Sequence, residues 1–234
     1  MIRGVAFDLE GTAIDVEFAH FEAFRLAAAE IDINFSRNNT AQDIAYRIPN
    51  AIGGGDALIA QGISRLSGGR TSVEWIRTRK DHLYNEIMEG LDSIEPRAGF
   101  LEIFEQIRGC GLPVAIASLT ERRQAKVLLS RSGIGKLFPP HLILLQDSVK
   151  NPKPAPDVYL EAARRMGIQP SEQLVFEDSV TGITAARRAG SCVVAMPIYT
   201  FPAHMEALKK AGPVEIFTSW TEIDSVTLAA LLDI

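Results

Sequence analysis

Apolar residues along this chain alternate between short continuous runs and longer segments with helical spacing. The short runs, which are typical of strands buried on both faces, lie at residues 2–7, 113–117, 141–146, 173–177, 191–196 and 214–217. Helical patterns separate them, at 99–109, 121–132, 156–166, 180–189 and 202–211. Because such alternation requires crossover connections, it predicts an α/β fold with a doubly wound, mostly parallel sheet and helices on both faces.

The alternation stops between residue 15 and about residue 94. Amphipathic helical segments follow one another there without a convincing strand, at 19–31, 40–47, 56–66 and 72–90. Pro96 and Gly99 mark the return to the core. The pattern predicts two domains, a core formed by residues 1–14 and 95–234 and an all-helical insertion over 15–94.

Two glycine runs lie in the insertion, at 53–55 and 68–69. Neither is followed by the Lys-Ser/Thr pair of a P-loop, so both are interpreted as helix connectors, with a substrate loop as the alternative.

Composition indicates an ordered globular protein and argues against some classes of binding partner. The chain has 234 residues, of which 47% are hydrophobic, so it can bury a sizeable core. A net charge of −5 without a concentrated Lys/Arg tract argues against nucleic acid or an anionic membrane as the main partner. We find no secretory leader and no run of about 18 apolar residues, so a cytoplasmic location is the default expectation. Cys110 and Cys192 fall in different elements and are expected to be small buried residues rather than a disulfide.

Two carboxylates, Asp8 and Glu10, directly follow the first apolar run and precede a turn at Gly11. In open α/β sheets, ligands bind just beyond the carboxyl ends of the strands, which is where Asp8 is expected. Taken alone, this segment fits a turn-capping aspartate equally well.

Three further segments favour an active site. Ser118 follows the apolar run 113–117, and Lys153 stands between two prolines that restrict the backbone. Glu177 and Asp178 close another apolar run. Together with Asp8 and Glu10, these residues form an ordered set of carboxylates, a hydroxyl and an ammonium group.

With these motifs, the sequence resembles the haloacid dehalogenase-like (HAD) phosphohydrolases, and within them the β-phosphoglucomutase-like subgroup. The matching segments are Asp8-Leu9-Glu10-Gly11-Thr12, Ala117-Ser118, Lys153-Pro154-Ala155-Pro156-Asp157, and Glu177-Asp178-Ser179 followed by Gly182 and Gly190. The resemblance covers nearly the whole chain and is weakest between about residues 35 and 90. It implies a Rossmann-like core and a helical cap that closes over the active site.

The resemblance makes Asp8 the nucleophile, since a carboxylate can form an aspartyl-phosphate and divide one difficult displacement into two steps. Glu10 lies on the same side of an extended chain, two residues on, and is expected to protonate the leaving alcohol and then activate water. The subgroup usually has aspartate there. A glutamate also occurs in enolase-phosphatase-like members, so the change is compatible with catalysis, and an impaired site is the alternative.

Positive charge and hydroxyl groups are needed for the phosphoryl oxygens. Ser118 is the predicted phosphate contact, with a plain helix cap as its alternative role and Thr120 as a rival cap. Lys153 is expected to offset the repulsion between Asp8 and the phosphate dianion. Lys150 is interpreted as a surface charge.

Clustered carboxylates repel one another unless a cation joins them, and Mg²⁺ suits such an oxygen-rich site. By resemblance, the ligands are Asp8, the backbone carbonyl of Glu10, and Asp178. Glu177 is an alternate ligand or a support for the others. A calcium or structural site is the less favoured alternative.

Substrate contacts are predicted from the loops and from the insertion. The core loops contribute Gly11, Thr12, Leu119 and Thr120, while the insertion contributes His20 and Arg47. A capping or surface role is the alternative for His20, and no local pattern supports Arg47. Val16 departs from the Ser or Thr that the family often has at that place.

The sequence therefore predicts a Mg²⁺-dependent phosphatase acting on a small phosphorylated metabolite, as a monomer or weak homodimer. A β-phosphoglucomutase-type phosphotransfer enzyme is the second hypothesis, because the core motifs do not separate the two. A phosphometabolite-binding protein without turnover is the third. A true dehalogenase fits less well, since it has little use for Glu177 and Asp178.

Overall fold

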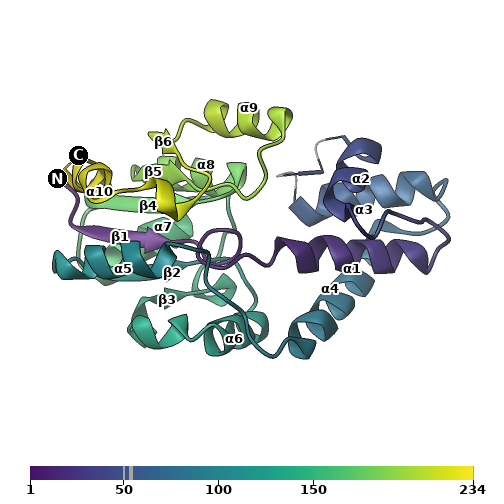
Figure 1. Cartoon of the computed structure of the whole chain (residues 1–234), viewed down its shortest axis with the longest axis horizontal. Coiled ribbons are helices and arrows are strands. Elements are labelled where there is room, and N and C mark those ends of the chain that lie inside the picture. The colour runs from purple at the N-terminus through teal and green to yellow at the C-terminus, as the bar shows by residue number, and fades with distance from the viewer. Residues whose placement is uncertain (50, 53–54, 234) are drawn as a thin grey trace. The chain divides into compact units, whose positions relative to one another are not determined.

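Parallel strands form a six-stranded sheet in the computed structural model, which describes residues 1–49, 51–52 and 55–233 (Figure 1). The strands are β1 (Gly4–Phe7), β2 (Val114–Ala117), β3 (Ile143–Leu144), β4 (Gln173–Glu177), β5 (Cys192–Ala195) and β6 (Glu215–Ile216). Their order across the sheet is β3-β2-β1-β4-β5-β6, and all neighbouring pairs are parallel. The predicted doubly wound α/β class is confirmed.

The central position of β1 places distant segments of the chain side by side. Phe7, the last residue of β1, is paired with Ile116 of β2 and with Phe176 of β4. Because the three strands run in one direction, the residues that follow them emerge at the same edge. Asp8 follows β1, Ser118 follows β2, and Glu177 is the last residue of β4, so the backbones of these three residues are close together at that edge.

Helices flank both faces of this sheet. They are α5 (Phe100–Gly109), α6 (Arg122–Arg131), α7 (Asp157–Met166), α8 (Val180–Ala189), α9 (Pro202–Ala211) and α10 (Ser225–Asp233). Short 3₁₀ turns occur at η1 (Ile134–Leu137), η2 (Pro140–Leu142), η3 (Gln146–Ser148), η4 (Pro170–Glu172) and η5 (Trp220–Glu222).

The two faces of the sheet bury different side chains. Ala6 and its neighbours on one face are small, and they pack against α7 and α8. Phe7 points to the opposite face, since successive strand residues alternate. There it stacks on Phe176 at 5.4 Å between ring centroids and meets Phe100 and Trp220 edge-on or tilted. Close packing on both faces fixes the carboxyl end of β1, where Asp8 lies.

Two elements differ from the sequence prediction. The run 141–146 contributes only two strand residues, because 3₁₀ turns occupy both of its ends. Helix α10 was not predicted, since its apolar residues show little helical periodicity. A local signal was present at its start, where the carboxylate of Asp224 accepts a hydrogen bond from the backbone N–H of Thr227 at 2.7 Å.

The chain separates into two compact units. The first comprises Met1–Asp15, Ser93–Thr200 and Met205–Ile234, and the second comprises Val16–Asp92 with Phe201–His204. The second unit contains α1 (Glu17–Ala29), α2 (Thr40–Arg47), α3 (Gly55–Leu66) and α4 (Val73–Gly90), and α4 packs against both α1 and α3. These helices coincide with the four predicted segments. The function of this unit as a cap stays a prediction.

The glycine runs fall partly on connectors. Gly68 and Gly69 follow α3 with positive φ angles and have open space around them. Gly55 begins α3, while Gly53 and Gly54 lie outside the described residues.

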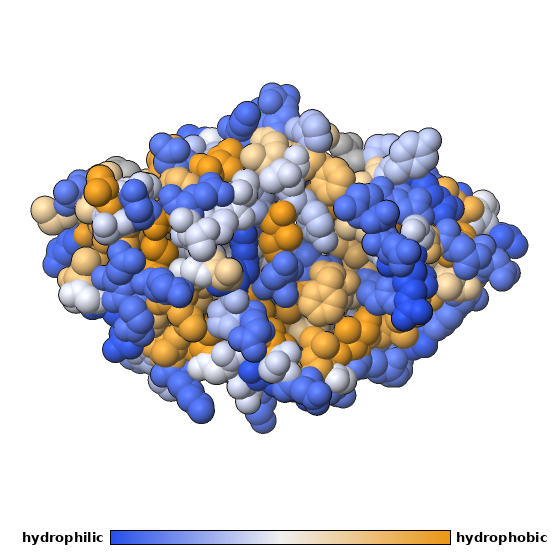
Figure 2. All heavy atoms as spheres, viewed as in Figure 1, coloured by the Kyte–Doolittle hydropathy of each residue, from blue (hydrophilic) through white to orange (hydrophobic). Residues whose placement is uncertain are grey.

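The surface view in Figure 2 shows hydrophilic side chains interspersed with apolar ones on the face that it draws. Among the described residues, no helix combines the length and the apolar character needed to cross a bilayer. Both cysteines are free, and Cys110 is exposed rather than buried as expected, while Cys192 is half-buried.

Candidate active site

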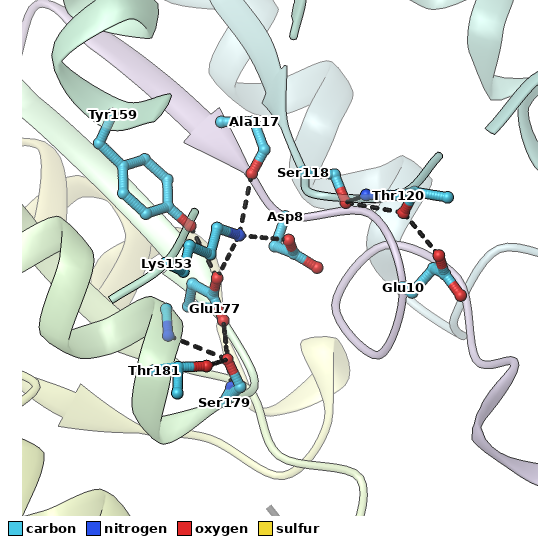
Figure 3. A network of polar contacts seen from close by, with 11 residues as sticks. Asp8, Glu10, Ala117, Ser118, Thr120, Lys153, Tyr159, Glu177, Ser179 and Thr181 are labelled. Atoms are coloured by element: carbon cyan, nitrogen blue, oxygen red, sulfur yellow. Dashed lines mark hydrogen bonds and ion pairs between the residues drawn. The ribbon is translucent and has the colours of Figure 1, made fainter. Parts of the chain in front are cut away.

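Asp8 lies directly after β1 and is almost inaccessible to solvent. Its side chain is 9% exposed, and its backbone N–H donates to the carbonyl of Phe176 at 3.0 Å. The neighbouring strands thus fix the backbone of the predicted nucleophile. Figure 3 shows its carboxylate facing the amine of Lys153.

Lys153 joins three elements of the core through one buried ammonium group. Its Nζ donates to Oδ1 of Asp8 at 2.6 Å, to Oε1 of Glu177 at 2.6 Å, and to the carbonyl of Ala117 at 3.1 Å. The side chain is 6% exposed. Lys150, by contrast, is exposed. The predicted preference for Lys153 as the inward lysine therefore agrees with the geometry.

Glu177 is enclosed by donors on both carboxylate oxygens. Oε1 accepts from Lys153 and from the hydroxyl of Tyr159 at 2.8 Å, and Oε2 accepts from the backbone N–H and the hydroxyl of Ser179 at 3.1 and 3.0 Å. A Cβ at Gly182 would lie 1.7 Å from Oε1, so only glycine admits the carboxylate there. Glu177 consequently serves as a fixed anion that orients Lys153.

Sequence reasoning missed Tyr159. It lies in the first turns of α7 and is fully buried. A buried tyrosine hydroxyl needs a hydrogen-bond partner, so a tyrosine on the sheet-facing side of a helix six residues after Lys153 was a usable signal.

The cluster contains two buried carboxylates and one ammonium group, so it carries excess negative charge. Burial raises the pKa of Asp8 to about 7, although Lys153 opposes the shift, and the charge of Glu177 adds to it. Burial would also raise the pKa of Glu177, but the charge and hydrogen bond of Lys153 outweigh it and lower that pKa below its ordinary value. Burial disfavours the charge of Lys153, yet the two carboxylates raise its pKa above normal. Lys153 and Glu177 thus form the stable ion pair, and Asp8 bears the uncompensated charge.

This charge excess predicts how stability depends on pH. The pKa of Asp8 is about 7 in the folded protein, whereas an unfolded aspartate has a pKa of about 3.9. Between these values the folded state binds the extra proton, so the free energy of unfolding of the metal-free protein is expected to fall as pH rises from about 4 to about 7. The lowered pKa of Glu177 has the opposite effect at more acidic pH, because protonation of Glu177 there reduces the free energy of unfolding.

Urea unfolding at a series of pH values in EDTA tests this expectation. Asp8→Asn is the control, and it should remove the decline over that window. A wild-type curve that rises or stays flat from pH 5 to pH 7 would contradict the assigned pKa shift.

Glu10 reaches a hydroxyl on the neighbouring loop. The hydroxyl of Thr120 donates to Oε1 of Glu10 at 2.5 Å, and the hydroxyls of Thr120 and Ser118 are 2.9 Å apart. Figure 3 shows this row of side chains beside Asp8. Ser118 and Thr120 are both buried. The structure thus brings the predicted general acid and the predicted phosphate contact into one hydrogen-bonded row.

Asp178 lies against the turn that follows β1. A Cβ built on Gly11 would be 2.1 Å from Oδ2 of Asp178, and Gly11 has a φ of +80°, so the close approach and the backbone conformation both require glycine. Asp178 is half-buried. This contact ties the predicted metal ligand to the loop that carries Glu10.

The carboxylates at this edge have the oxygen ligands that Mg²⁺ prefers. Mg²⁺ uses one or two carboxylates together with waters and substrate phosphate. Asp8 and Asp178 supply two, and the uncompensated charge at Asp8 favours a cation. Within the described residues, no three or more His, Cys, Asp or Glu side chains are grouped so that they could hold a metal ion by themselves. Glu177 fits the ligand role less well, because four donors already occupy it.

Arg97 is a second residue that sequence reasoning missed. Its guanidinium donates to the carbonyls of Gly11 at 2.6 Å and of Thr218 at 2.9 Å, and also to that of Met196. Burial lowers its pKa, and the charge of Asp178 opposes that shift. Arg97 therefore ties together the loops that follow β1, β5 and β6. The sequence could have identified Arg97 from its position just before Gly99, where the chain re-enters the core.

The other core-loop residues predicted to contact substrate are wholly or partly buried. Thr12 is fully buried, and its carbonyl accepts from the indole N–H of Trp220 at 3.0 Å. Its hydroxyl has no hydrogen-bond partner among the described residues. Leu119 is half-buried between Ser118 and Thr120.

His20 and Arg47 belong to the helical unit. His20 stacks on Tyr84, and its Nδ1 is 2.8 Å from Nζ of Lys80, a buried lysine that the sequence did not single out. Arg47 donates to the carbonyl of Asn34 at 2.7 Å and lies over the ring of Phe35. His20 thus lies in a buried polar cluster, whereas Arg47 has a structural partner in its own unit.

Comparisons with known proteins agree with this geometry. The model of the haloacid dehalogenase-like hydrolase family matches residues 2–190. Fructose-1-phosphate phosphatase YqaB of Escherichia coli is 32% identical over 80% of this chain and 92% of its own length. A phosphorylated carbohydrates phosphatase of Thermotoga maritima is 26% identical over 81% of this chain and 82% of its own. The crystal structure of β-phosphoglucomutase from Clostridium difficile has a TM-score of 0.72 at 18% identity, covering 100% of this chain and 98% of that one, and it shows the shared fold.

Proposed function

Since the chain belongs to the haloacid dehalogenase-like hydrolases and is a phosphoric monoester hydrolase, we propose that it releases phosphate from a small sugar phosphate through an aspartyl-phosphate on Asp8. The observation that carries the proposal is the buried group of Asp8, Lys153 and Glu177 beside the row Ser118, Thr120 and Glu10. The phosphatases named among its relatives act on fructose 1-phosphate and phosphorylated carbohydrates, and they support this substrate class.

The first step transfers the phosphoryl group to Asp8. An oxygen of the Asp8 carboxylate attacks phosphorus, the ester P–O bond breaks, and Glu10 donates its proton to the leaving alkoxide. Lys153 lies 2.6 Å from Asp8, so its charge offsets the repulsion between that carboxylate and the phosphate dianion. Ser118 donates its hydroxyl to a phosphoryl oxygen.

The second step regenerates Asp8. Glu10, now ionised, removes a proton from water as the water attacks phosphorus, and the acyl–phosphate bond breaks to release inorganic phosphate. Glu177 keeps Lys153 oriented in both steps through its hydrogen bonds with Tyr159 and Ser179.

Asp8, Asp178 and the carbonyl of Glu10 would hold Mg²⁺. When bound, the ion supplies positive charge for the phosphoryl oxygens and for Asp8. The helical unit over 15–94 is proposed as the cap that excludes bulk water during both steps.

Phosphate release from a panel of sugar monophosphates, measured with Mg²⁺ and with EDTA, tests the proposal. We expect release from at least one sugar monophosphate, and we expect EDTA to abolish it. β-Glucose 1-phosphate with a trace of the bisphosphate separates the alternative, because glucose 6-phosphate without free phosphate would identify a mutase. Thermal stabilisation by ligands without any turnover would instead indicate a binding protein.

A further inference from the structure

The hydroxyl of Thr120 makes a short hydrogen bond to Glu10 across two segments that are 110 residues apart in sequence. Thr120 is 7% exposed and Glu10 is half-buried, so this contact is partly buried. The backbone of Thr120 is itself fixed, because its carbonyl accepts from the N–H of Gln146 at 3.3 Å. Thr120 therefore presents its hydroxyl from a supported loop.

Along the row Ser118, Thr120 and Glu10, each hydroxyl donates its hydrogen bond toward Glu10. An ionised carboxylate only accepts, so the proton of the Thr120 hydroxyl lies toward Glu10. The Ser118 hydroxyl, 2.9 Å away, then donates to Oγ1 of Thr120. The backbone N–H of Thr120 points at Oγ of Ser118 at 3.4 Å. When the Ser118 hydroxyl donates its hydrogen bond to a phosphoryl oxygen instead, the bond from Thr120 to Glu10 remains.

Glu10 has one more rotatable bond than aspartate, so its carboxyl group explores more positions unless something restrains it. Proton transfer to a leaving group requires the acid within hydrogen-bond reach of the departing oxygen. The contact with Thr120 supplies such a restraint at one oxygen of the carboxyl group, Oε1.

We propose that Thr120 is the positioning residue for Glu10, rather than only a contact for substrate. The inference rests on the proposed function, because it assigns Glu10 as the acid and base. It predicts that Thr120 affects the steps that move a proton through Glu10 and leaves the attack by Asp8 intact.

Leaving-group dependence separates these effects. p-Nitrophenolate leaves without protonation, whereas a sugar alkoxide needs the acid. For Thr120→Val we expect kcat with the sugar phosphate to fall about 10–100-fold, with KM little changed. With p-nitrophenyl phosphate, formation of the phosphoenzyme should stay near the wild-type rate while its hydrolysis slows, so a burst of p-nitrophenolate should appear.

Three controls sharpen the test. Thr120→Ser keeps the hydroxyl and should restore turnover. Thr184→Val makes the same chemical change in α8, where the hydroxyl donates to the carbonyl of Val180 at 2.7 Å, and should leave both substrates unaffected. Glu10→Gln with Thr120→Val should be no slower than Glu10→Gln alone. Thr120→Ala replaces the valine variant if the latter does not fold.

Several results would overturn the inference while the proposed function stands. These are equal losses in the rate of phosphoenzyme formation with both substrates, a change confined to KM, or additive losses in the double variant. A wild-type protein without phosphate release from any substrate would instead refute the proposed function itself.

Discussion

The Asp8→Asn variant is expected to lose phosphate release by at least about a thousandfold while remaining folded. An amide cannot attack phosphorus to give a stable acyl-phosphate, so both steps of the reaction stop. The replacement is nearly isosteric and removes the uncompensated charge of the buried cluster. Above pH 7 the variant should therefore be at least as stable as the wild type.

Phosphate release at saturating Mg²⁺ tests the expected loss of turnover, and urea unfolding at pH 8 tests the expected stability. Asp147→Asn is the matched control, since Asp147 is an exposed carboxylate paired with Arg122 outside the site. Its turnover should stay within about twofold of wild type. Full activity in Asp8→Asn would assign the nucleophile to another group.

The Lys153→Met variant is expected to lose both turnover and stability. Without the ammonium group, Asp8 and Glu177 remain buried together without a counter-charge. Breaking a buried ion pair in this way costs about 3–5 kcal/mol of unfolding free energy at neutral pH. The deficit should shrink toward pH 5, because protonation of Asp8 then relieves the repulsion.

Lys150→Met provides the control for Lys153. Lys150 lies three residues earlier and is exposed, so its replacement should change stability by less than about 0.5 kcal/mol. Urea unfolding at pH 5 and pH 8, with steady-state turnover at pH 7, distinguishes the two lysines. Equal effects of both substitutions would show that turnover and stability depend on the net charge of the protein and not on the buried contacts of Lys153.

Much of the fold was accessible from the sequence because its signals are local. Apolar runs such as 173–177 mark strands by themselves, and the alternation of strands and helices restricts them to a parallel sheet. The same logic indicated that Asp8, Ser118 and Glu177 meet at one edge, since carboxyl ends of parallel strands share that edge. Helix α10 was not predicted because its apolar residues show little helical periodicity.

The sequence by itself determined the class of the fold, the helical insertion, and the residue types that gather at the carboxyl edge of the sheet. Only the tertiary structure decided which of these groups touch. The contacts of Lys153 with Asp8 and Glu177, of Tyr159 with Glu177, and of Thr120 with Glu10 join segments that are distant in sequence. They depend on strand order and on side-chain packing, which no local pattern of the chain encodes.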